Sequence, residues 1–287
     1  MNRVTLRHLL LASLFVFFFV SDGFSKSECK AVYGQSARLF TLATGSPGEL
    51  GLLEKLADEF NREHGTSMCW QKAGSGKSLA LLKNKEVDLV MVHAPAAEKK
   101  AVEDGWAIKR TLIGSNEFYI VGPADDPAGI RGAGSAAEAY KMIAAKQLPF
   151  LSRGDNSGTH KKELNIWKTA GVTPEGDWYV VTKDFMMATL KKANDIGGYF
   201  MTDSSTWVVG QKDFADLKIL FKGDPVLINT YHGLCQPEGA TVGQEAASKF
   251  IDFLSSEAGQ SIIRTYGEAD HGAPMYNDAD YARQYEH

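Results

Sequence analysis

Apolar residues along the chain follow two alternating spacings. Short apolar runs at residues 38–43, 86–93 and 117–123 have the length and composition of buried strands. Each is followed, directly or after a loop, by a segment whose apolar positions recur every three to four residues, as in the helix where Leu53 and Phe60 share a face. Strands that alternate with helices predict parallel sheets covered by helices. The expected fold class is therefore α/β.

The same two spacings continue to the end of the chain. Further strands are expected at 67–71, 178–182, 198–203 and 217–221, and further helices at 95–105, 136–146, 161–170, 186–193 and 246–254. Gly122-Pro123 and the run 226–229 are the points where we expect the chain to pass between two lobes. They predict a first part of lobe 1 over 26–121, lobe 2 over 122–226, and a return to lobe 1 over 227–287.

Residues 1–25 have the organisation of a secretory signal peptide. Arg3 and Arg7 precede an apolar stretch from Leu9 to Val20, and small residues follow as a cleavage region. The apolar stretch is short for a bilayer-spanning helix, and no later run is long enough to cross a membrane. An uncleaved anchor is the alternative interpretation of this segment. We expect a periplasmic or secreted protein after cleavage.

The composition excludes several classes of protein. Of 287 residues, 44% are hydrophobic and 23% are charged, as in an ordinary globular protein long enough for two lobes. The formal net charge of −4 argues against a nucleic-acid partner, so any anion must be bound locally. Seven scattered histidines show no metal-ligand spacing, and neither a metal nor a cofactor is expected. Cys29, Cys69 and Cys235 allow one disulfide, whose pairing the spacing does not decide.

Three hydroxyl-rich loops each connect a strand-like run to a helical one. They are Thr44-Gly45-Ser46, Gly74-Ser75-Gly76 and the segment 152–159. The first N–H groups of a helix have no intrahelical partner and its dipole favours negative charge there, so each loop can present donors to an anion. The third loop adds Arg153, whose planar guanidinium suits a tetrahedral oxyanion. These loops predict an anion-binding site, and plain helix capping is the alternative role of their hydroxyls.

The segment Gly76-Lys77-Ser78 matches the end of the phosphate-loop motif. That motif also requires a glycine five residues before Gly76, where this chain has Gln71. A nucleotide-binding phosphate loop is therefore rejected, although the glycine-rich turn can still expose backbone donors.

Six blocks of sequence occur in the same order as in one known family. They are Thr44-Gly45-Ser46, Gly74-Ser75-Gly76, Val92-His93-Ala94-Pro95-Ala96-Ala97-Glu98, Tyr119-Ile120-Val121-Gly122-Pro123 with Asp126-Pro127-Ala128-Gly129-Ile130, Ser152-Arg153-Gly154-Asp155-Asn156-Ser157-Gly158-Thr159-His160, and Gly223-Asp224-Pro225. Over essentially the whole mature chain these blocks resemble the tungstate-binding periplasmic proteins of ABC importers. The resemblance implies a two-lobed type II periplasmic-binding-protein fold, with mainly parallel sheets covered by helices and a ligand cleft between the lobes. It also implies ligand contacts, residue by residue, from Thr44, Ser46, Ser75, Arg153 and Thr159, with Ser157 a further candidate.

The chain departs from the family's pattern in two places. The family's first loop is usually Thr-Thr-Thr-Ser, whereas here it is Ala43-Thr44-Gly45-Ser46, with two hydroxyls fewer. The family's Thr-Asp-Arg-Gly-Thr corresponds here to residues 202–206, with Ser204 in place of the basic residue. Both departures weaken the case for tungstate itself without removing the anion site.

The protonation of the ligand separates the candidate anions. Phosphate carries a proton at neutral pH, so a selective site needs a carboxylate acceptor, whereas tungstate, molybdate and sulfate are dianions whose sites need only donors. The block around Arg153 also resembles phosphate-binding proteins, but those place an acidic residue where this chain has His93-Ala94. We expect Asp155 to orient Arg153 and His93 to be a hydrogen-bonded structural residue. Tungstate is the expected ligand and molybdate the next, with phosphate or sulfate as alternatives.

Three functional classes are compatible with these residues. A transport receptor would close its lobes on the anion and present the complex, as a monomer, to an ABC permease in the membrane. An enzyme would need Ser157, His160 and Asp155 as a triad, but triads assemble from separate segments, so no catalytic activity is expected. A module that kept the fold and lost the ligand is the third class. The transport receptor is the function that we predict.

Overall fold

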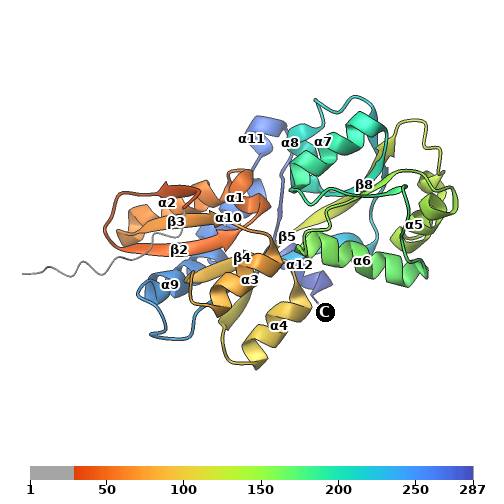
Figure 1. Cartoon of the computed structure of the whole chain (residues 1–287). Helices are drawn as coiled ribbons and strands as arrows, with labels where there is room; N and C mark the ends of the chain where they lie inside the picture. The colour runs from red at the N-terminus through yellow and green to blue at the C-terminus, as the bar shows by residue number, and fades with distance from the viewer. Residues whose placement is uncertain (1–28, 287) are drawn as a thin grey trace, which may run out of the picture.

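The protein folds into two α/β lobes joined at their centre (Figure 1). The computed structural model describes residues 29–286. The signal peptide predicted over residues 1–25 lies outside the described residues. Between residues 29 and 286, no helix combines the length and the apolar character that crossing a membrane requires.

Lobe 1 is built from the beginning and the end of the chain. Its N-terminal part contains β1 (Ala31–Tyr33), β2 (Leu39–Thr44), α1 (Ser46–Glu49), α2 (Leu52–His64), β3 (Ser67–Lys72), α3 (Ser75–Lys83), β4 (Leu89–Val92) and α4 (Pro95–Glu103). Its C-terminal part contains β10 (Ile228–Cys235), α9 (Gln244–Ser255), α10 (Glu257–Thr265), α11 (Glu268–His271), β11 (Asn277–Asp278), α12 (Ala279–Ala282) and η3 (Arg283–Tyr285).

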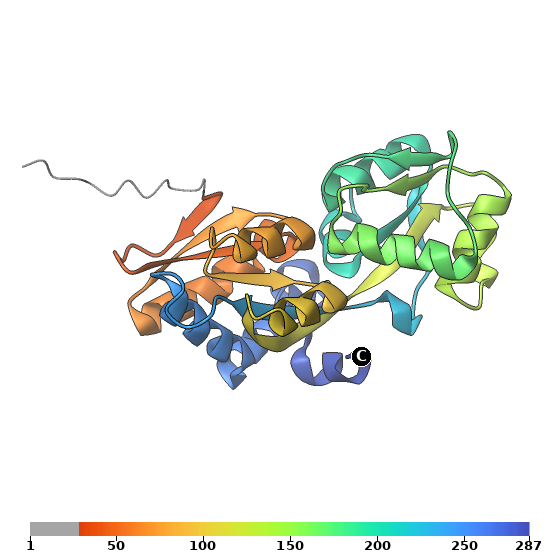
Figure 2. The same cartoon turned by 60° about the horizontal axis from the view of Figure 1, so that its bottom comes forward.

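Lobe 2 is built from the middle of the chain. It contains η1 (Ile130–Gly132), α5 (Ala136–Ala145), β6 (Phe150–Ser152), α6 (Gly158–Ala170), β7 (Tyr179–Val181), α7 (Met186–Ile196), β8 (Tyr199–Asp203), α8 (Ser204–Gly210), β9 (Leu217–Phe221) and η2 (Pro225–Leu227). The long strand β5 (Ile108–Pro123), yellow in Figure 2, runs from lobe 1 into lobe 2.

The strands form one mixed sheet in the order β1-β3-β2-β4-β10-β5-β8-β6-β7, and β9 and β11 also pair with β5. Parallel pairs lie inside each lobe, where β2 pairs with β3 and β4, and β6 pairs with β7 and β8. The pairs made by β5 and β10 are antiparallel. The predicted α/β class is confirmed. The antiparallel pairs of β5 and β10 lie where the chain passes between the lobes, and β1 also pairs antiparallel with β3 at the outer edge of lobe 1.

The strand predicted at 117–123 is the end of a much longer one. β5 begins at Ile108 and pairs along its first part with β10, and from Phe118 onward it pairs with β8 of lobe 2. The first part of β5 is not recognisable from the sequence, because a buried strand is recognised by an apolar run and this part contains Lys109, Arg110 and Asn116. Backbone pairing with β10, which lies far along the sequence, makes this segment a strand.

The two lobes have separate hydrophobic cores. One cluster takes all its buried residues from positions 118–227, with Trp167, Tyr140 and Phe150 at its centre. The other clusters take theirs from positions 40–113 and 234–276. This separation supports the predicted lobe boundaries, which remain a prediction.

A disulfide joins Cys29 to Cys69 on β3, and Cys235 on β10 is a buried free thiol. The bond fixes the segment before β1 to the sheet of lobe 1. It selects one of the pairings that the sequence left open, and such a bond persists in an oxidising compartment.

Helix α6 begins at the loop around which the predicted site is centred. Ser157 is its N-cap, and the Ser157 hydroxyl accepts a hydrogen bond from the His160 backbone N–H at 3.3 Å. Gly171 ends the helix with φ of 69°, a left-handed conformation that glycine adopts without strain. Trp167 and Glu163 lie on the buried face of α6, against the core of lobe 2.

The carboxyl group of Glu163 is buried in that core. Its Oε1 accepts hydrogen bonds from the Tyr179 hydroxyl at 2.6 Å and from the Trp167 indole N–H at 3.3 Å. Burial raises the pKa of Glu163 to about 7. A carboxyl group whose pKa is raised in the folded state contributes stability below its unfolded-state pKa, and this stability is lost as the pH rises through about 7.

The substitution Glu163→Gln should therefore change how stability depends on pH. Between pH 4.5 and pH 8 the free energy of unfolding of the variant should improve relative to the unmodified protein by ~3 kcal/mol, because the variant has no carboxylate to ionise in the core. Urea unfolding at several pH values measures this difference. The exposed Glu175→Gln is the matched control and should follow the unmodified protein; parallel curves for Glu163→Gln would contradict the assignment.

Candidate functional site

A small cavity of about 10 Å³ lies where the two lobes meet. It is lined by the starts of α1 and α3 and the end of β4 from lobe 1, by the loops before α6 and α7 from lobe 2, and by the crossing strand β10. The lining residues are Gly45, Ser46, Gly74, Ser75, Met91, His93, Arg153, Ser157, Phe185 and Tyr231. A space of this size is about the minimum that one water molecule needs, and it is far smaller than pockets for organic ligands.

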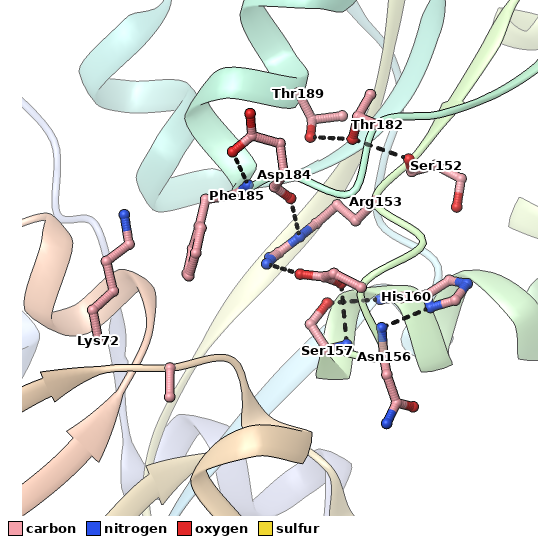
Figure 3. Close-up of polar contacts among 12 residues, drawn as sticks. Lys72, Ser152, Arg153, Asn156, Ser157, His160, Thr182, Asp184, Phe185 and Thr189 are labelled. Atoms are coloured by element: carbon pink, nitrogen blue, oxygen red, sulfur yellow. Dashed lines mark hydrogen bonds and ion pairs between the residues drawn. The ribbon is translucent and has the colours of Figure 1, made fainter.

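Arg153 is the cationic side chain of this lining, and its position is fixed on several sides (Figure 3). The residue is 4% exposed and follows β6 directly. Its Nε donates to the Asp184 carbonyl oxygen at 3.2 Å, and its Nη2 donates to the Asp155 carboxylate at 2.5 Å. The guanidinium also lies 5.4 Å from the ring centroid of Phe185. A guanidinium held in this way is already oriented before a ligand arrives.

Asp155 orients two components of the site at once. One carboxylate oxygen accepts from Arg153, and the other accepts from the Ser157 backbone N–H at 3.1 Å. The expectation that Asp155 is the partner of Arg153 is confirmed. Since both oxygens accept from protein donors and Asp155 is outside the cavity lining, its carboxylate does not face the ligand space.

Two longer helices direct their N-termini at the cavity. Ser75 is the first residue of α3 and Ser157 the N-cap of α6, and both are almost fully buried. The Ser75 hydroxyl accepts from the His93 backbone N–H at 3.2 Å and so keeps its own proton available. The helix dipoles add positive potential from both lobes at one point.

The structure brings four of the six predicted ligand contacts to the cavity. Ser46, Ser75, Arg153 and Ser157 line it. Thr44 is buried beside it, but the Thr44 hydroxyl donates to the Met91 carbonyl oxygen at 2.9 Å and ties β2 to β4. Thr159 is buried in the first turn of α6 outside the lining. Ligand contact by any of the six remains a prediction.

Three lining residues with aromatic rings were not predicted as contacts from the sequence. Phe185 precedes α7, Tyr231 lies on β10, and His93 follows β4. His93 was expected to be a hydrogen-bonded structural residue, yet its Nδ1 is buried without a hydrogen-bond partner among residues 29–286. Its place directly after a buried strand, like that of the hydroxyl-rich loops, was the signal that could have identified it.

The alternative of a Ser157–His160–Asp155 triad is not favoured by the geometry. The His160 Nδ1 accepts from the Asn156 backbone N–H at 3.1 Å, and the Ser157 hydroxyl is bonded to the His160 backbone rather than to its ring. Asp155 is occupied by Arg153 and by the Ser157 backbone. The serine therefore has no base positioned on its hydroxyl, which activation as a nucleophile requires.

The two departures from the family's pattern differ in their structural role. Gly45 lines the cavity, so one of the two missing hydroxyls concerns the ligand space directly, whereas Ala43 is buried in the core of lobe 1. Ser204 does not line the cavity; it begins α8, where its hydroxyl accepts from the Glu117 backbone N–H at 3.3 Å. Asp203 caps this helix by accepting from Thr206 at 2.8 Å. In this chain the second segment therefore supports the start of a helix.

Comparison with known proteins agrees with this fold. A family model of the PBP superfamily domain matches residues 31–258. The tungstate-binding protein TupA of Peptoclostridium acidaminophilum is 35% identical over 237 residues, which cover 81% of this chain and 82% of that protein. The crystal structure of the tungstate ABC transporter from Geobacter sulfurreducens is 37% identical with a TM-score of 0.73, covering 81% of this chain and 100% of that one.

A second solved structure is similarly close. The tungstate-binding protein TupA from Desulfovibrio alaskensis G20 is 36% identical with a TM-score of 0.70, and the match covers 84% of this chain and 98% of that one. Identity of this size over nearly the whole of both chains goes beyond a shared fold. The chain therefore belongs to the PBP superfamily and, within it, to the family of periplasmic binding proteins that includes the TupA proteins.

Proposed function

We propose that this protein is an extracytoplasmic substrate-binding protein that captures a tetrahedral oxyanion, tungstate first and molybdate next, for an ABC importer. The observation that carries the proposal is the buried Arg153, held in fixed orientation by Asp155 at a small cavity between the lobes. The names of the relatives support tungstate as the ligand, because the match to them covers most of the chain.

The chemistry of the lining favours an unprotonated dianion. Hydroxyls, helix N-termini and a guanidinium offer donors, and no carboxylate occurs among the lining residues of the described chain. A dianion loses much hydration on entering a cavity of this kind, so donors on every side are needed to offset the loss. Phosphate, sulfate and a fold that has lost its ligand are the alternatives.

The remaining components of the proposal follow from this role. The protein would be exported, act as a monomer without a nucleic-acid partner, and deliver its anion to an ABC permease in the membrane. It would not be an enzyme, which agrees with the absence of a base bonded to the Ser157 hydroxyl in the described chain.

Closure of the lobes over the anion depends on close approaches at glycine. A Cβ atom at Gly158 would lie 2.6 Å from the His93 Nδ1 and 2.7 Å from the His93 backbone oxygen. A Cβ atom at Gly76 would lie 2.7 Å from the backbone oxygen of Asn156. Each pair joins one lobe to the other, so these contacts exist only while the lobes are together. The glycines allow the N-termini of α3 and α6 to reach the same anion.

A cation–π contact joins the lobes at the rim of the cavity. The Lys72 ammonium, at the end of β3, lies 3.9 Å from the ring centroid of Phe185, and it also pairs with Glu49 at 2.6 Å (Figure 3). Phe185 covers Arg153 as well. This contact stabilises the closed arrangement of the lobes and shields the Arg153 guanidinium from solvent.

Thermal unfolding with tungstate, molybdate, sulfate or phosphate, added one at a time, tests the proposed function. Binding to the native state must raise the melting temperature, and we expect the largest rise with tungstate, then molybdate. Arg153→Ala should weaken binding by about 100-fold or more, since it removes the cation and leaves Asp155 unpaired.

The matched control for this variant is Lys161→Ala, which removes an exposed charge from α6, the helix that follows the Arg153 loop, without touching the cavity. It should keep the affinity of the unmodified protein.

A rise in melting temperature with phosphate alone would identify phosphate, rather than tungstate, as the ligand. No rise in melting temperature with any of the four anions would refute the proposal of an oxyanion receptor.

Gly158→Ala should oppose closure while sparing the fold. The added methyl group clashes with His93 only when the lobes meet, and alanine is a better helix former than glycine. We expect affinity for tungstate to fall about tenfold or more, with no loss of melting temperature in the ligand-free protein. Isothermal titration and thermal unfolding measure the two effects.

Gly132→Ala serves as the control for this second variant, because nothing lies within 4 Å of the added Cβ. Its affinity should be unchanged. Undiminished tungstate binding by Gly158→Ala would show that the contact with His93 is not part of the bound state.

A further inference from the structure

The charge of the anion cavity is nearly balanced before a ligand enters. Arg153 is the cationic side chain of the lining, and the Asp155 carboxylate pairs with it at 2.5 Å. Ser204 occupies the position at which the family's pattern has a second basic residue. The whole chain has a formal net charge of −4, so its overall field does not attract anions. A further positive charge near the cavity is therefore the component that a dianion site of this composition lacks.

Lys162 places such a charge on the hinge side of the cavity. It begins the second turn of α6, five residues after the N-cap Ser157, which corresponds to about 7.5 Å along the helix axis. Lys162 lines a second cavity of about 180 Å³, and His93 is the residue that the linings of the two cavities share. Lys162 is thus located behind the anion cavity, on the far side of His93.

The charge of Lys162 acts on the lining of the anion cavity. Burial lowers the pKa of His93 to about 3, and the positive charges of Arg153 and Lys162 lower it further. Asn229 and Asp155 act in the opposite direction. Two cations, one at the cavity and one behind it, therefore add their potentials at the same lining residue.

The hydrogen-bond partners of Lys162 are electrically neutral. Its ammonium donates to the backbone oxygens of Val226 at 2.8 Å and Ile228 at 2.9 Å. It also lies 5.6 Å from the ring centroid of Phe118. Asp224 acts on it from a distance, and both Asp224 carboxylate oxygens accept hydrogen bonds from backbone N–H groups. These contacts hold the ammonium in place and leave it positively charged.

The other charged groups of the second cavity are paired with one another. Arg110 contacts the Glu286 carboxylate at 2.7 Å and the Glu98 carboxylate at 3.1 Å. The His232 imidazole lies between these carboxylates, at 2.9 Å from Glu98 and 3.1 Å from Glu286. This group has no surplus of positive charge. In the described chain, Lys162 is therefore the cation of this lining that can act on an anion next door.

We propose that Lys162 determines specificity for charge: held behind the cavity by the carbonyl oxygens of the hinge segment, it favours a dianion over a monoanion of the same shape without contacting either. The inference rests on the proposed function and deepens it. The Coulomb energy is proportional to the charge of the ligand, so one lysine attracts a dianion twice as strongly as a monoanion at the same place. Lys162 supplies the positive charge that residues 202–206 do not.

Tungstate and perrhenate separate this charge effect from a structural one. Both are tetrahedral oxyanions of nearly the same size, and they carry two negative charges and one. Isothermal titration of the purified protein measures both Kd values. Lys162→Gln keeps a donor for the hinge carbonyls and removes the charge, so it should weaken tungstate binding about tenfold and perrhenate binding only about threefold. Lys162→Arg keeps the charge and should retain the preference for tungstate.

The dependence of tungstate binding on pH provides a readout in the unmodified protein. Burial lowers the pKa of Lys162 to about 8, and Asp224 acts in the opposite direction. The affinity that depends on this charge is present below pH 8 and is lost as the lysine deprotonates, while carboxylates and guanidinium groups do not titrate in this range. A tenfold coupling predicts a Kd about fivefold higher at pH 9 than at pH 7. The Kd should stay level in Lys162→Gln and in Lys162→Arg.

The matched control is Lys161→Gln, which removes an exposed lysine from the adjacent position of α6. It should leave both Kd values and the pH dependence unchanged. Where perrhenate binds too weakly to be measured, the pH series with tungstate decides.

The outcomes separate the two levels of the argument. Equal losses of tungstate and perrhenate affinity in Lys162→Gln would show a structural role at the hinge. That result, or a tungstate Kd that is the same in Lys162→Gln and independent of pH, overturns this inference and leaves the proposed function standing. No binding of tungstate, molybdate, sulfate or phosphate by the unmodified protein overturns the proposed function and the inference together.

Discussion

A guanidinium removed from water must be surrounded by partners, and the structure around Arg153 satisfies this constraint. The Asp155 carboxylate, the Asp184 carbonyl and the Phe185 ring contact the group from different sides. These partners hold the side chain still, but the Arg153–Asp155 pair has little net charge. The attraction for a dianion must therefore be completed by neutral donors and helix N-termini from both lobes.

The crossing strands take part in the site as well as connecting the lobes. Tyr231 of β10 lines the cavity, and the amide chain from Asn229 to Asn116 links β10 to β5 behind His93. Lys162 of α6 donates to the carbonyl oxygens of Val226 and Ile228, where the chain leaves lobe 2. The helix whose N-terminus lies at the cavity is thus bonded to the segment where the chain passes between the lobes.

Local features of the sequence predicted most of the fold and the centre of the site. Apolar periodicity located most helices and strands, and the hydroxyl loops located Ser46, Ser75, Arg153 and Ser157. Long-range pairing determined what the sequence could not give. The first part of β5 is a strand only because β10 pairs with it. The Thr44 hydroxyl donates a hydrogen bond to a carbonyl oxygen of the neighbouring strand and is therefore not free for a ligand.

The same limit explains the residues that sequence reasoning did not identify as lining the cavity. Phe185 and Tyr231 reach the cavity from segments without hydroxyl-rich loops, and their contribution depends on how the lobes meet. The environment of His93 depends on Asn229, which is distant in the sequence. The cysteine pairing likewise follows from the position of Cys29 beside β3, which no spacing rule supplies.

The position of β10 has a consequence for how the chain acquires its structure. β10 lies between β4 and β5, although it follows them by more than the whole of lobe 2 in the sequence. A chain that emerges from its N-terminus can complete the core of lobe 2 while the sheet of lobe 1 still has two open edges. The lobe that begins first is therefore finished last, and in that interval its unpaired strands are available to other chains. Assembly of this protein is most vulnerable at the strand on which its hinge depends.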